Sequence, residues 1–338
     1  MKLISFFARD KERVGLLVND HVYELSRLYP GWPVNMQELL ENWERWFKQL
    51  QKMNISLHEK HRVYFPNNHI SELRILAPVT KPGSCRDGYA FRQHVEAARR
   101  NRGLPMIPEF DQYPIFYYTN HRTIQGPGNV YCMPDHFMQL DFELEVAIVI
   151  GKEGKNIMAK DADTYIAGLM IMNDISARTL QMEEMLLNLG PAKGKDFSTV
   201  IGPWLVTLDE LSDKEVPCKL NHVGKTWDLT MKAFVNGVQV SSGNVKEMDW
   251  TFAEIIERAS YGVTLYPGDV IGSGTVGTGC FLELNGTARL LDPSFIPQWL
   301  KEGDQVHLVA ERLGMLSNTM TKTPCEHSIL NKKKTAQQ

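Results

Sequence analysis

Three acidic residues alternate with apolar ones just before a strongly apolar run: Asp141, Glu143 and Glu145 precede residues 146–150. A run this rich in Val and Ile predicts a buried strand, and alternate side chains of a strand share a face. Carboxylates are rarely buried without a partner, because desolvating their charge is costly. The three therefore indicate a cation, and oxygen-only ligands favour Mg²⁺, Mn²⁺ or Ca²⁺ over zinc. An edge strand with a solvated acidic face is the alternative that this pattern leaves open.

A second candidate ligand, Asp174, closes another apolar run and precedes a helix-like segment. Aspartate commonly caps a helix at such a position, so Asp174 is interpreted either as an N-cap or as a ligand. Arg178 and Gln181 follow on one face of the expected helix. They are placed to contact a substrate anion beside a cation, and a surface ion pair is the alternative for the arginine.

Asp87 and His94 flank the start of a segment that is expected to be helical, residues 88–101. Their spacing of seven residues is two helical turns, which would place both side chains on one face. Histidine titrates near neutrality, so His94 beside a cation is a candidate general base acting on water. A surface or packing role is the alternative for a single histidine.

Two glycine-containing segments resemble phosphate loops in their letters. Residues 190–197 contain Lys195, but their spacing is one short of GxxxxGK and Asp196 stands where Ser or Thr is required. Residues 272–277 match GxGxxG, but they are expected to run into a strand, with no helix to receive a pyrophosphate. Both are interpreted as glycine turns, whose N–H groups, with Lys195 in the first, still suit an oxyanion.

Strands outnumber helices in the chain that must position these residues. Residues 1–72 predict a small unit with three short strands and a helix, bounded by a polar stretch at 58–69. Residues 73–318 lack the regular alternation of a doubly wound sheet, and 319–338 form a polar tail. In the large domain, strands are expected at 73–79, 142–151, 166–172, 201–207, 232–236, 269–273, 281–290 and 305–312, and helices at 88–101, 175–188 and 250–259. The prediction is a mixed, mainly β fold.

Composition and charge exclude several classes of protein. The chain has 338 residues and a net charge of −3, which argues against a nucleic-acid partner. Its apolar runs fall short of the roughly 20 residues that span a bilayer, and the N-terminal run is too short for a signal peptide. The five cysteines are scattered without CxxC spacing, as in proteins whose thiols stay reduced. We therefore expect a cytoplasmic protein without a membrane partner.

Taken in order, these motifs resemble the fumarylacetoacetate hydrolase family over residues 73–318. The matching motifs are Asp87…Tyr89…His94, Asp141-Phe142-Glu143-Leu144-Glu145, Asn173-Asp174…Arg178…Gln181, Gly194-Lys195…Phe197 and Gly274-Thr275-Val276. None of them is specific alone, but the ordered set is. Residues 99–122 do not align, so the arginine and tyrosine with which the family binds substrate there are unassigned.

The resemblance implies a β-sandwich roll with a small N-terminal α+β domain, assembled as a homodimer. It also implies a cation, Mg²⁺ or alternatively Ca²⁺ or Mn²⁺, held by Asp87, Glu143, Glu145 and Asp174. Asp141 is then left outside the ligand set, so two rather than three of the alternating carboxylates bind the cation.

The resemblance assigns the remaining candidates to catalysis and substrate binding. His94 would be the general base, oriented by Glu283, and Lys195 would stabilise the oxyanion. The residues that would contact the substrate are Tyr89, Arg178, Gln181 and Thr275.

Asp87 together with His94 resembles fumarylacetoacetase more than the shorter members of the family. The implied reaction is hydrolysis of a carbon–carbon bond in a 1,3-diketo acid such as fumarylacetoacetate, giving fumarate and acetoacetate. The alternatives are an acylpyruvate hydrolase, or an oxaloacetate decarboxylase, which is a lyase and needs no attacking water. A non-catalytic binding protein stabilised by metal is a third interpretation.

Overall fold

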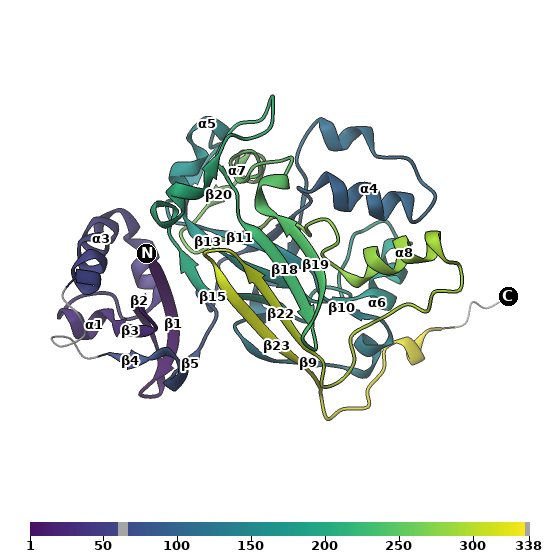
Figure 1. The fold of residues 1–338 in the computed structure, drawn as a ribbon, viewed down its shortest axis with the longest axis horizontal. Coiled ribbons are helices and arrows are strands. Elements are labelled where there is room, and N and C mark those ends of the chain that lie inside the picture. The colour runs from purple at the N-terminus through teal and green to yellow at the C-terminus, as the bar shows by residue number, and fades with distance from the viewer. Residues whose placement is uncertain (60–66, 335–338) are drawn as a thin grey trace.

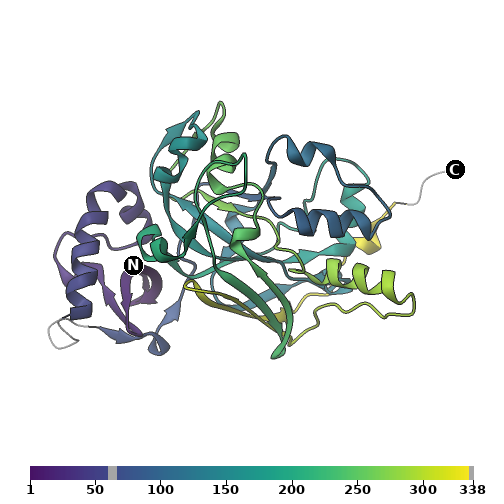
Figure 2. The ribbon, with the colours of Figure 1, turned by 45° about the horizontal axis from the view of Figure 1, so that its top comes forward.

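Two β-sheets packed face to face form the body of the protein (Figures 1 and 2). The computed structural model describes residues 1–59 and 67–334. Within these residues, the larger sheet contains twelve strands and the smaller sheet five. The predicted mixed, mainly β fold is confirmed.

The larger sheet runs through both the N-terminal unit and the main body. Its strands in order are β4 (Asn68–His69), β3 (His21–Glu24), β2 (Lys11–Val18), β1 (Lys2–Ala8), β15 (Thr199–Val206), β13 (Ile166–Asp174), β11 (Leu144–Ile150), β21 (Val270–Gly272), β6 (Cys85–Gly88) and β7 (Phe116–Thr119). Two further strands pair with it at the side, β5 (Arg74–Ile75) with β1 and β8 (Ile124–Gln125) with β15.

The smaller sheet and the helices complete the fold. The sheet has the order β19 (Val238–Asn244), β18 (Thr230–Val235), β22 (Gln305–Ala310), β23 (Gly314–Lys322) and β9 (Gly128–Cys132). Two-stranded pairs are formed by β10 (Leu140–Asp141) with β14 (Ser176–Ala177), β12 (Gly154–Lys155) with β20 (Thr264–Leu265), and β16 (Glu215–Val216) with β17 (Thr226–Trp227). The helices are α1 (Leu25–Leu28), α2 (Met36–Glu41), α3 (Trp43–Glu59), α4 (Arg92–Arg100), α5 (Ala159–Ala162), α6 (Arg178–Met185), α7 (Phe252–Ser260) and α8 (Phe281–Leu291).

Strand β11 is buried on both faces, which explains its uninterrupted apolar sequence. Val146 and Ile148 belong to the core between the two sheets, whereas Ala147 and Val149 belong to a second core on the opposite face. Side chains alternate along a strand, so two cores require apolar residues at every position. The prediction of a buried strand at 146–150 is therefore confirmed.

The N-terminal unit shares the larger sheet with the main body. Strand β1 pairs antiparallel with β15, with Leu3 opposite Leu205, and both residues enter the second core together with Trp43 of α3. In Figure 1 this unit, in purple, lies at one end of the molecule. The boundary expected at 58–69 falls largely on residues 60–66, which lie outside the described residues, and the division at 72/73 stays a prediction.

One predicted element is of the wrong type: residues 281–290 form helix α8 instead of a strand. The segment Phe281-Leu282-Glu283-Leu284 alternates like a strand. However, the carboxylate of Asp141 accepts hydrogen bonds from the N–H groups of Phe281 and Leu282, at 2.8 and 2.9 Å. These N–H groups have no partner inside a helix, so a carboxylate there stabilises its start. The contact spans 140 residues and is invisible in the local pattern.

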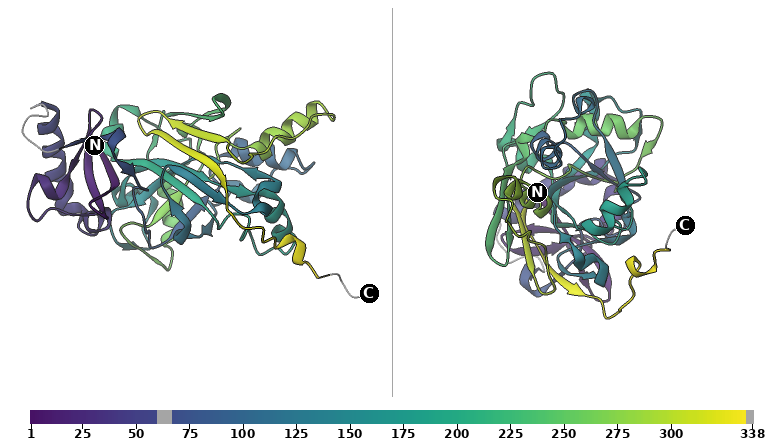
Figure 3. Two further views of the ribbon diagram at one scale, coloured as in Figure 1. Left: turned by 90° about the horizontal axis from the view of Figure 1, so that it is seen from below. Right: turned by 90° about the vertical axis from the view of Figure 1, so that its right-hand side faces the viewer.

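Other boundaries differ by smaller amounts. The strand expected at 73–79 is reduced to β5, and strands β7, β9, β19 and β23 had not been predicted. Strand β23 continues through Lys322, so residues 319–322 belong to the smaller sheet and not to a tail. Figure 3 shows that α8 and the C-terminal segment lie at the end of the molecule opposite the N-terminal unit.

Candidate functional site

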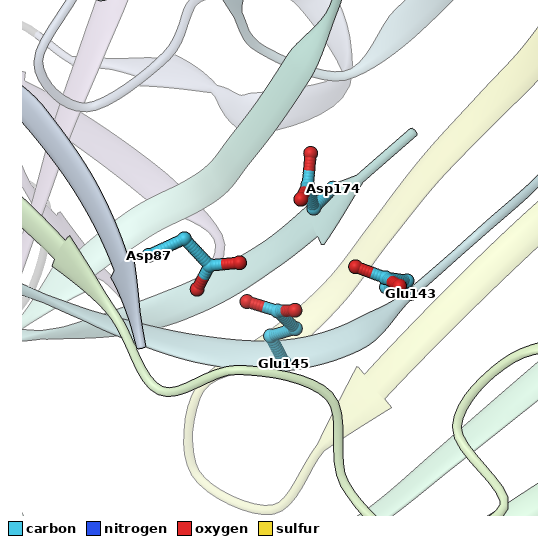
Figure 4. A group of neighbouring side chains, drawn as sticks. All are labelled: Asp87, Glu143, Glu145 and Asp174. Carbon is cyan, nitrogen blue, oxygen red and sulfur yellow. The ribbon is translucent and has the colours of Figure 1, made fainter. Parts of the chain in front are cut away.

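Four carboxylates converge beside strands β13, β11 and β6 of the larger sheet. Glu145 lies on β11, Asp174 ends β13 and Asp87 lies on β6, while Glu143 lies in the break between β10 and β11. One oxygen atom of each lies within 4.8 Å of the others, and the four side chains point toward one another in Figure 4. The structure therefore brings together all four residues that the family resemblance named as ligands.

Asp87 reaches the site from an element that the sequence did not predict for it, whereas Asp174 ends an apolar strand as expected. Asp87 lies on a strand, paired in parallel with Gly272 and antiparallel with Tyr117, and α4 begins only at Arg92. The prediction that Asp87 and His94 share a helical face is therefore wrong. Asp174 does not cap α6, whose N-cap residue is Ala177.

The cluster has the buried negative charge that a divalent cation requires. All four side chains are buried, and Glu145 Oε2 and Asp174 Oδ1 are enclosed without a hydrogen-bond partner. Burial, with the charge of Asp174, raises the pKa of Asp87 to about 8. Burial and the neighbouring Asp87 raise the pKa of Glu145 well above its usual value. Both pKa shifts arise from burial and, after it, from the neighbouring carboxylates, and a cation bound here would offset both effects. The residues therefore fit a hard divalent cation such as Mg²⁺, Mn²⁺ or Ca²⁺.

Lys195 supplies part of the missing positive charge. Its ammonium lies 2.5 Å from Glu143 Oε2 and 2.7 Å from Asp174 Oδ2, and only 4% of the residue is exposed. Although burial acts in the opposite direction, Lys195 and Arg178 lower the pKa of Glu143 to about 2. The same attraction holds the pKa of Lys195 above its usual value despite its burial. Glu143 is therefore ionised and Lys195 is protonated across the physiological range.

Asp141 and Arg178 form a buried ion pair beside the cluster. Arg178 Nε donates to Asp141 at 2.9 Å, Nη2 lies 2.9 Å from Glu143, and Nη1 donates to Gln181 at 2.9 Å. The strand is interrupted between β10 and β11, and Asp141 lies outside the carboxylate cluster, as the family resemblance implied. The first interpretation, in which all three alternating carboxylates face one cation, is wrong for Asp141. With these contacts made, the buried guanidinium fits a role in holding the site, and substrate binding by Arg178 and Gln181 stays a prediction.

A buried histidine and glutamate pair from two helices lies near the cluster, since His94 is among the groups that lower the pKa of Glu143. His94 in the first turn of α4 lies with Nδ1 2.6 Å from Oε2 of Glu283, in the first turn of α8. The other oxygen of Glu283 accepts the N–H of Thr278 at 2.9 Å. With a carboxylate oxygen as its partner, Nδ1 is the donor of this hydrogen bond, and Nε2 of the neutral ring is then an acceptor. The ring of Tyr89 stands edge-on to His94, with the ring centres 6.1 Å apart.

The loop that matches GxGxxG encloses Asp87. The N–H of Gly274 donates to Asp87 at 3.0 Å, and Thr275 Oγ1 lies 3.4 Å from Glu145. At φ +78°, Gly274 packs so closely on Gly88 that a Cβ would lie 2.5 Å from its carbonyl oxygen, so only glycine fits. The sequence-based reason for rejecting a phosphate loop here was wrong, because helix α8 does follow, but the loop serves a carboxylate of the cluster.

Tyr117 is a site residue that the sequence did not reveal. It lies on β7, within the segment 99–122, and its hydroxyl donates to Asp174. It lines a cavity of about 260 Å³ together with Tyr118, Thr119, Asn120, Pro191, Ala192, Lys195 and Asp196. A tyrosine within an aromatic strand gives no signal of its own. Only the pairing of Tyr117 with Asp87 across two strands places it here.

Comparison with known proteins agrees with this arrangement. The family profile described as Fumarylacetoacetate (FAA) hydrolase C-terminal matches residues 84–321. This chain belongs to the fumarylacetoacetate hydrolase family. The match includes every residue of the carboxylate cluster and of the His94–Glu283 pair.

Relatives in the family carry different activity names. Oxaloacetate tautomerase Fahd2a, mitochondrial, from Rattus norvegicus is 31% identical over 330 residues, covering 94% of this chain and 91% of the relative. Fumarylacetoacetase from Oryza sativa subsp. japonica is 30% identical over 290 residues, covering 71% and 66%. The solved structure of maleylpyruvate hydrolase from Sphingobium sp. SYK-6 with manganese(II) and pyruvate has a TM-score of 0.66 at 19% identity, covering 95% of this chain and 99% of that one. That structure establishes a shared fold.

Three further expectations have different outcomes. Among the described residues, no helix is long and apolar enough to cross a membrane. All five cysteines are free thiols. The cytoplasmic location and the homodimer stay predictions, and the rat relative is named as mitochondrial.

Proposed function

We propose that this protein is a metal-dependent enzyme that interconverts the keto and enol forms of a β-keto dicarboxylic acid, with oxaloacetate as its substrate. The observation that carries the proposal is a buried proton-transfer pair, His94 and Glu283, near a site of four carboxylates. The rat relative, which matches nearly the whole chain, supplies the substrate by its name. This favours oxaloacetate, the substrate of the lyase alternative in the sequence analysis, over fumarylacetoacetate, although tautomerisation was not among the reactions expected there.

Two groups of residues would share the reaction: the four carboxylates would hold the cation, and His94 would transfer the proton. A divalent cation at Asp87, Glu143, Glu145 and Asp174 would withdraw electron density from the carbonyl oxygen of the substrate. Nε2 of His94 takes a proton from the carbon between the carbonyl and the distal carboxylate, and the resulting imidazolium, directly or through water, gives a proton to the enolate oxygen. Glu283 holds the ring in the tautomer that leaves Nε2 free and stabilises the imidazolium that forms. The donors Lys195 and Tyr117 lie at the cavity side of the cluster, where a substrate oxygen is expected.

The same pair supports a second candidate, hydrolysis of a carbon–carbon bond in a 1,3-diketo acid. Nε2 of His94 is also suited to taking a proton from water, which would then attack the carbonyl carbon. Tautomerisation consumes no water and breaks no carbon–carbon bond, so product analysis separates the two. Decarboxylation, the lyase alternative, is recognised by its product pyruvate.

The test follows the enol absorbance of oxaloacetate after mixing with protein and Mg²⁺ or Mn²⁺. A control with metal but no protein is needed, because both metals also act on oxaloacetate alone. We expect acceleration over the metal-only control, and a decrease of about 10²-fold or more in His94→Asn. The matched control is His222→Asn, which alters a histidine paired with Glu254 at 3.0 Å in another part of the chain.

Three results would overturn the proposal. The first is no acceleration over metal alone, and the second is equal rates for His94→Asn and the control. The third is conversion of fumarylacetoacetate to fumarate and acetoacetate with no effect on oxaloacetate, which would establish the hydrolase instead.

A further inference from the structure

The loop that carries Lys195 has an anchor outside the candidate site. Residues 190–196 follow α6 and form one wall of the cavity described above. Lys195 points from this loop to Glu143 and Asp174. A lysine side chain is long and flexible, so the loop backbone must be fixed for its ammonium to stay in one place.

Glu184, in the last turn of α6, binds three consecutive N–H groups of this loop. One oxygen accepts from Ala192 at 2.7 Å and from Gly194 at 3.1 Å, and the other accepts from Lys193 at 2.6 Å. Successive backbone N–H groups turned inward form a concave site for an anion. Hydrogen bonds to an ionised acceptor are about twice as strong as neutral ones. Here the anion is a side chain of the protein itself.

The rest of the loop is docked close to α6 and to the opposite cavity wall. Gly194 lies against Gln181, where a Cβ would be 2.6 Å from the Gln181 nitrogen, and its carbonyl accepts the N–H of Ala177 at 2.8 Å. On the other side, the Asp196 carbonyl accepts from Asn120 at 3.1 Å and Thr123 at 2.8 Å. Between these two attachments, Glu184 holds the turn that sets where Lys195 begins.

We propose that Glu184 is a positioning residue for Lys195. Its carboxylate fixes the turn 192–194 and thereby aims the ammonium at Glu143 and Asp174. The neighbouring Glu183 differs in its contacts, because it pairs with Lys333 of the C-terminal segment. Both glutamates are half-buried on the same helix, so Glu183 is a matched control. The kinetic part of the inference rests on the proposed function, and the structural part does not.

The structural experiment compares Glu184→Ala, Glu184→Gln and Glu183→Ala with the unchanged protein and needs no substrate. Amide hydrogen exchange at 192–194 should be about tenfold faster or more in Glu184→Ala, because three charge-assisted hydrogen bonds are lost. Acylation of Lys195, measured by peptide mass spectrometry, should rise in parallel. Glu183→Ala should match the unchanged protein, and Glu184→Gln, which keeps one acceptor oxygen, should lie between.

The kinetic experiment uses the same variants with oxaloacetate and Mn²⁺. Displacement of a catalytic group by about 1 Å costs up to about 10²-fold in rate, so kcat should fall toward that value in Glu184→Ala with KM changed much less. Unchanged exchange and labelling would overturn the inference, as would faster exchange with unchanged kcat. If the unchanged protein does not turn over oxaloacetate, the proposed function fails, while the exchange data still decide the role of Glu184. If Glu184→Ala does not fold, Glu184→Gln decides by the same criteria.

Discussion

Asp141→Asn should weaken the fold strongly while changing the side-chain volume very little. Asp141 is fully buried. Its oxygens accept the N–H groups of Phe142, Phe281 and Leu282 at 2.8–2.9 Å, and Arg178 Nη2 lies at 2.8 Å. An amide replaces one acceptor oxygen by an NH₂ group that faces other donors, and it removes the charge opposite Arg178.

The expected loss is about 3–5 kcal/mol of unfolding free energy. Removing one partner of a buried ion pair costs about 3–5 kcal/mol, and each buried donor left unsatisfied costs about 1–3 kcal/mol. Arg178 keeps its contact with Glu143 at 2.9 Å, so the two contributions should not add in full. Against a total stability of about 5–15 kcal/mol, such a loss would be a large fraction.

Equilibrium urea unfolding followed by circular dichroism measures this loss as a lower midpoint. Asp228→Asn is the matched control, since Asp228 pairs with Lys246 at the surface and its loss should leave the midpoint nearly unchanged. Asp141 also fixes the start of α8, which carries Glu283, so kcat should fall in folded Asp141→Asn. A midpoint equal to that of the unchanged protein would refute the assignment of Asp141 as the residue that holds α8.

Three further outcomes are expected. Glu283→Gln should lower kcat by about 10²–10⁴-fold, because the His94 tautomer is no longer fixed, and equal kcat values would contradict the pairing at 2.6 Å. Adding Mg²⁺ or Mn²⁺ should raise the melting temperature, because a metal concentration of one hundred times Kd stabilises the folded state by about 2.7 kcal/mol. Glu145→Gln should largely remove this rise. Burial, with the charge of Lys193, lowers the pKa of His136 to about 4. The contribution of His136 to the unfolding free energy is therefore fully present above the usual pKa near 6.5 and is lost as the pH falls toward 4. Between these two pH values, His136 should contribute about 1.4 kcal/mol per pH unit to the slope of the unfolding free energy against pH. Urea unfolding at several pH values should therefore show a shallower slope for His136→Phe.

The sequence predicts those strands that are buried on both faces, because such strands must be apolar at nearly every position. Residues 146–150 and 166–172 are apolar throughout because both faces of β11 and β13 are covered, and a single sequence shows this directly. The prediction of a strand at 281–290 was wrong because Asp141, far away in the chain, stabilises the start of helix α8. The prediction that Asp87 shares a helical face with His94 was wrong because Asp87 lies on a strand that pairs with β21 and β7.

The site shows the same division. The four carboxylates and the His94–Glu283 pair were named through ordered motifs, and the structure places each set together. Tyr117 and Glu184 were missed, because an aromatic run and an acidic helix end are common in any protein. Their importance comes from what they touch, Asp174 and the turn before Lys195.

The antiparallel junction of β1 with β15 limits how the chain can be shortened. Removing residues 1–72 would strip the partner from Leu205 and Val206 and uncover Ile201 and Leu205 of the second core. An unpaired strand edge next to exposed apolar side chains is a template for intermolecular pairing. A fragment cut to the family domain alone should therefore aggregate, although it would retain every carboxylate of the cluster.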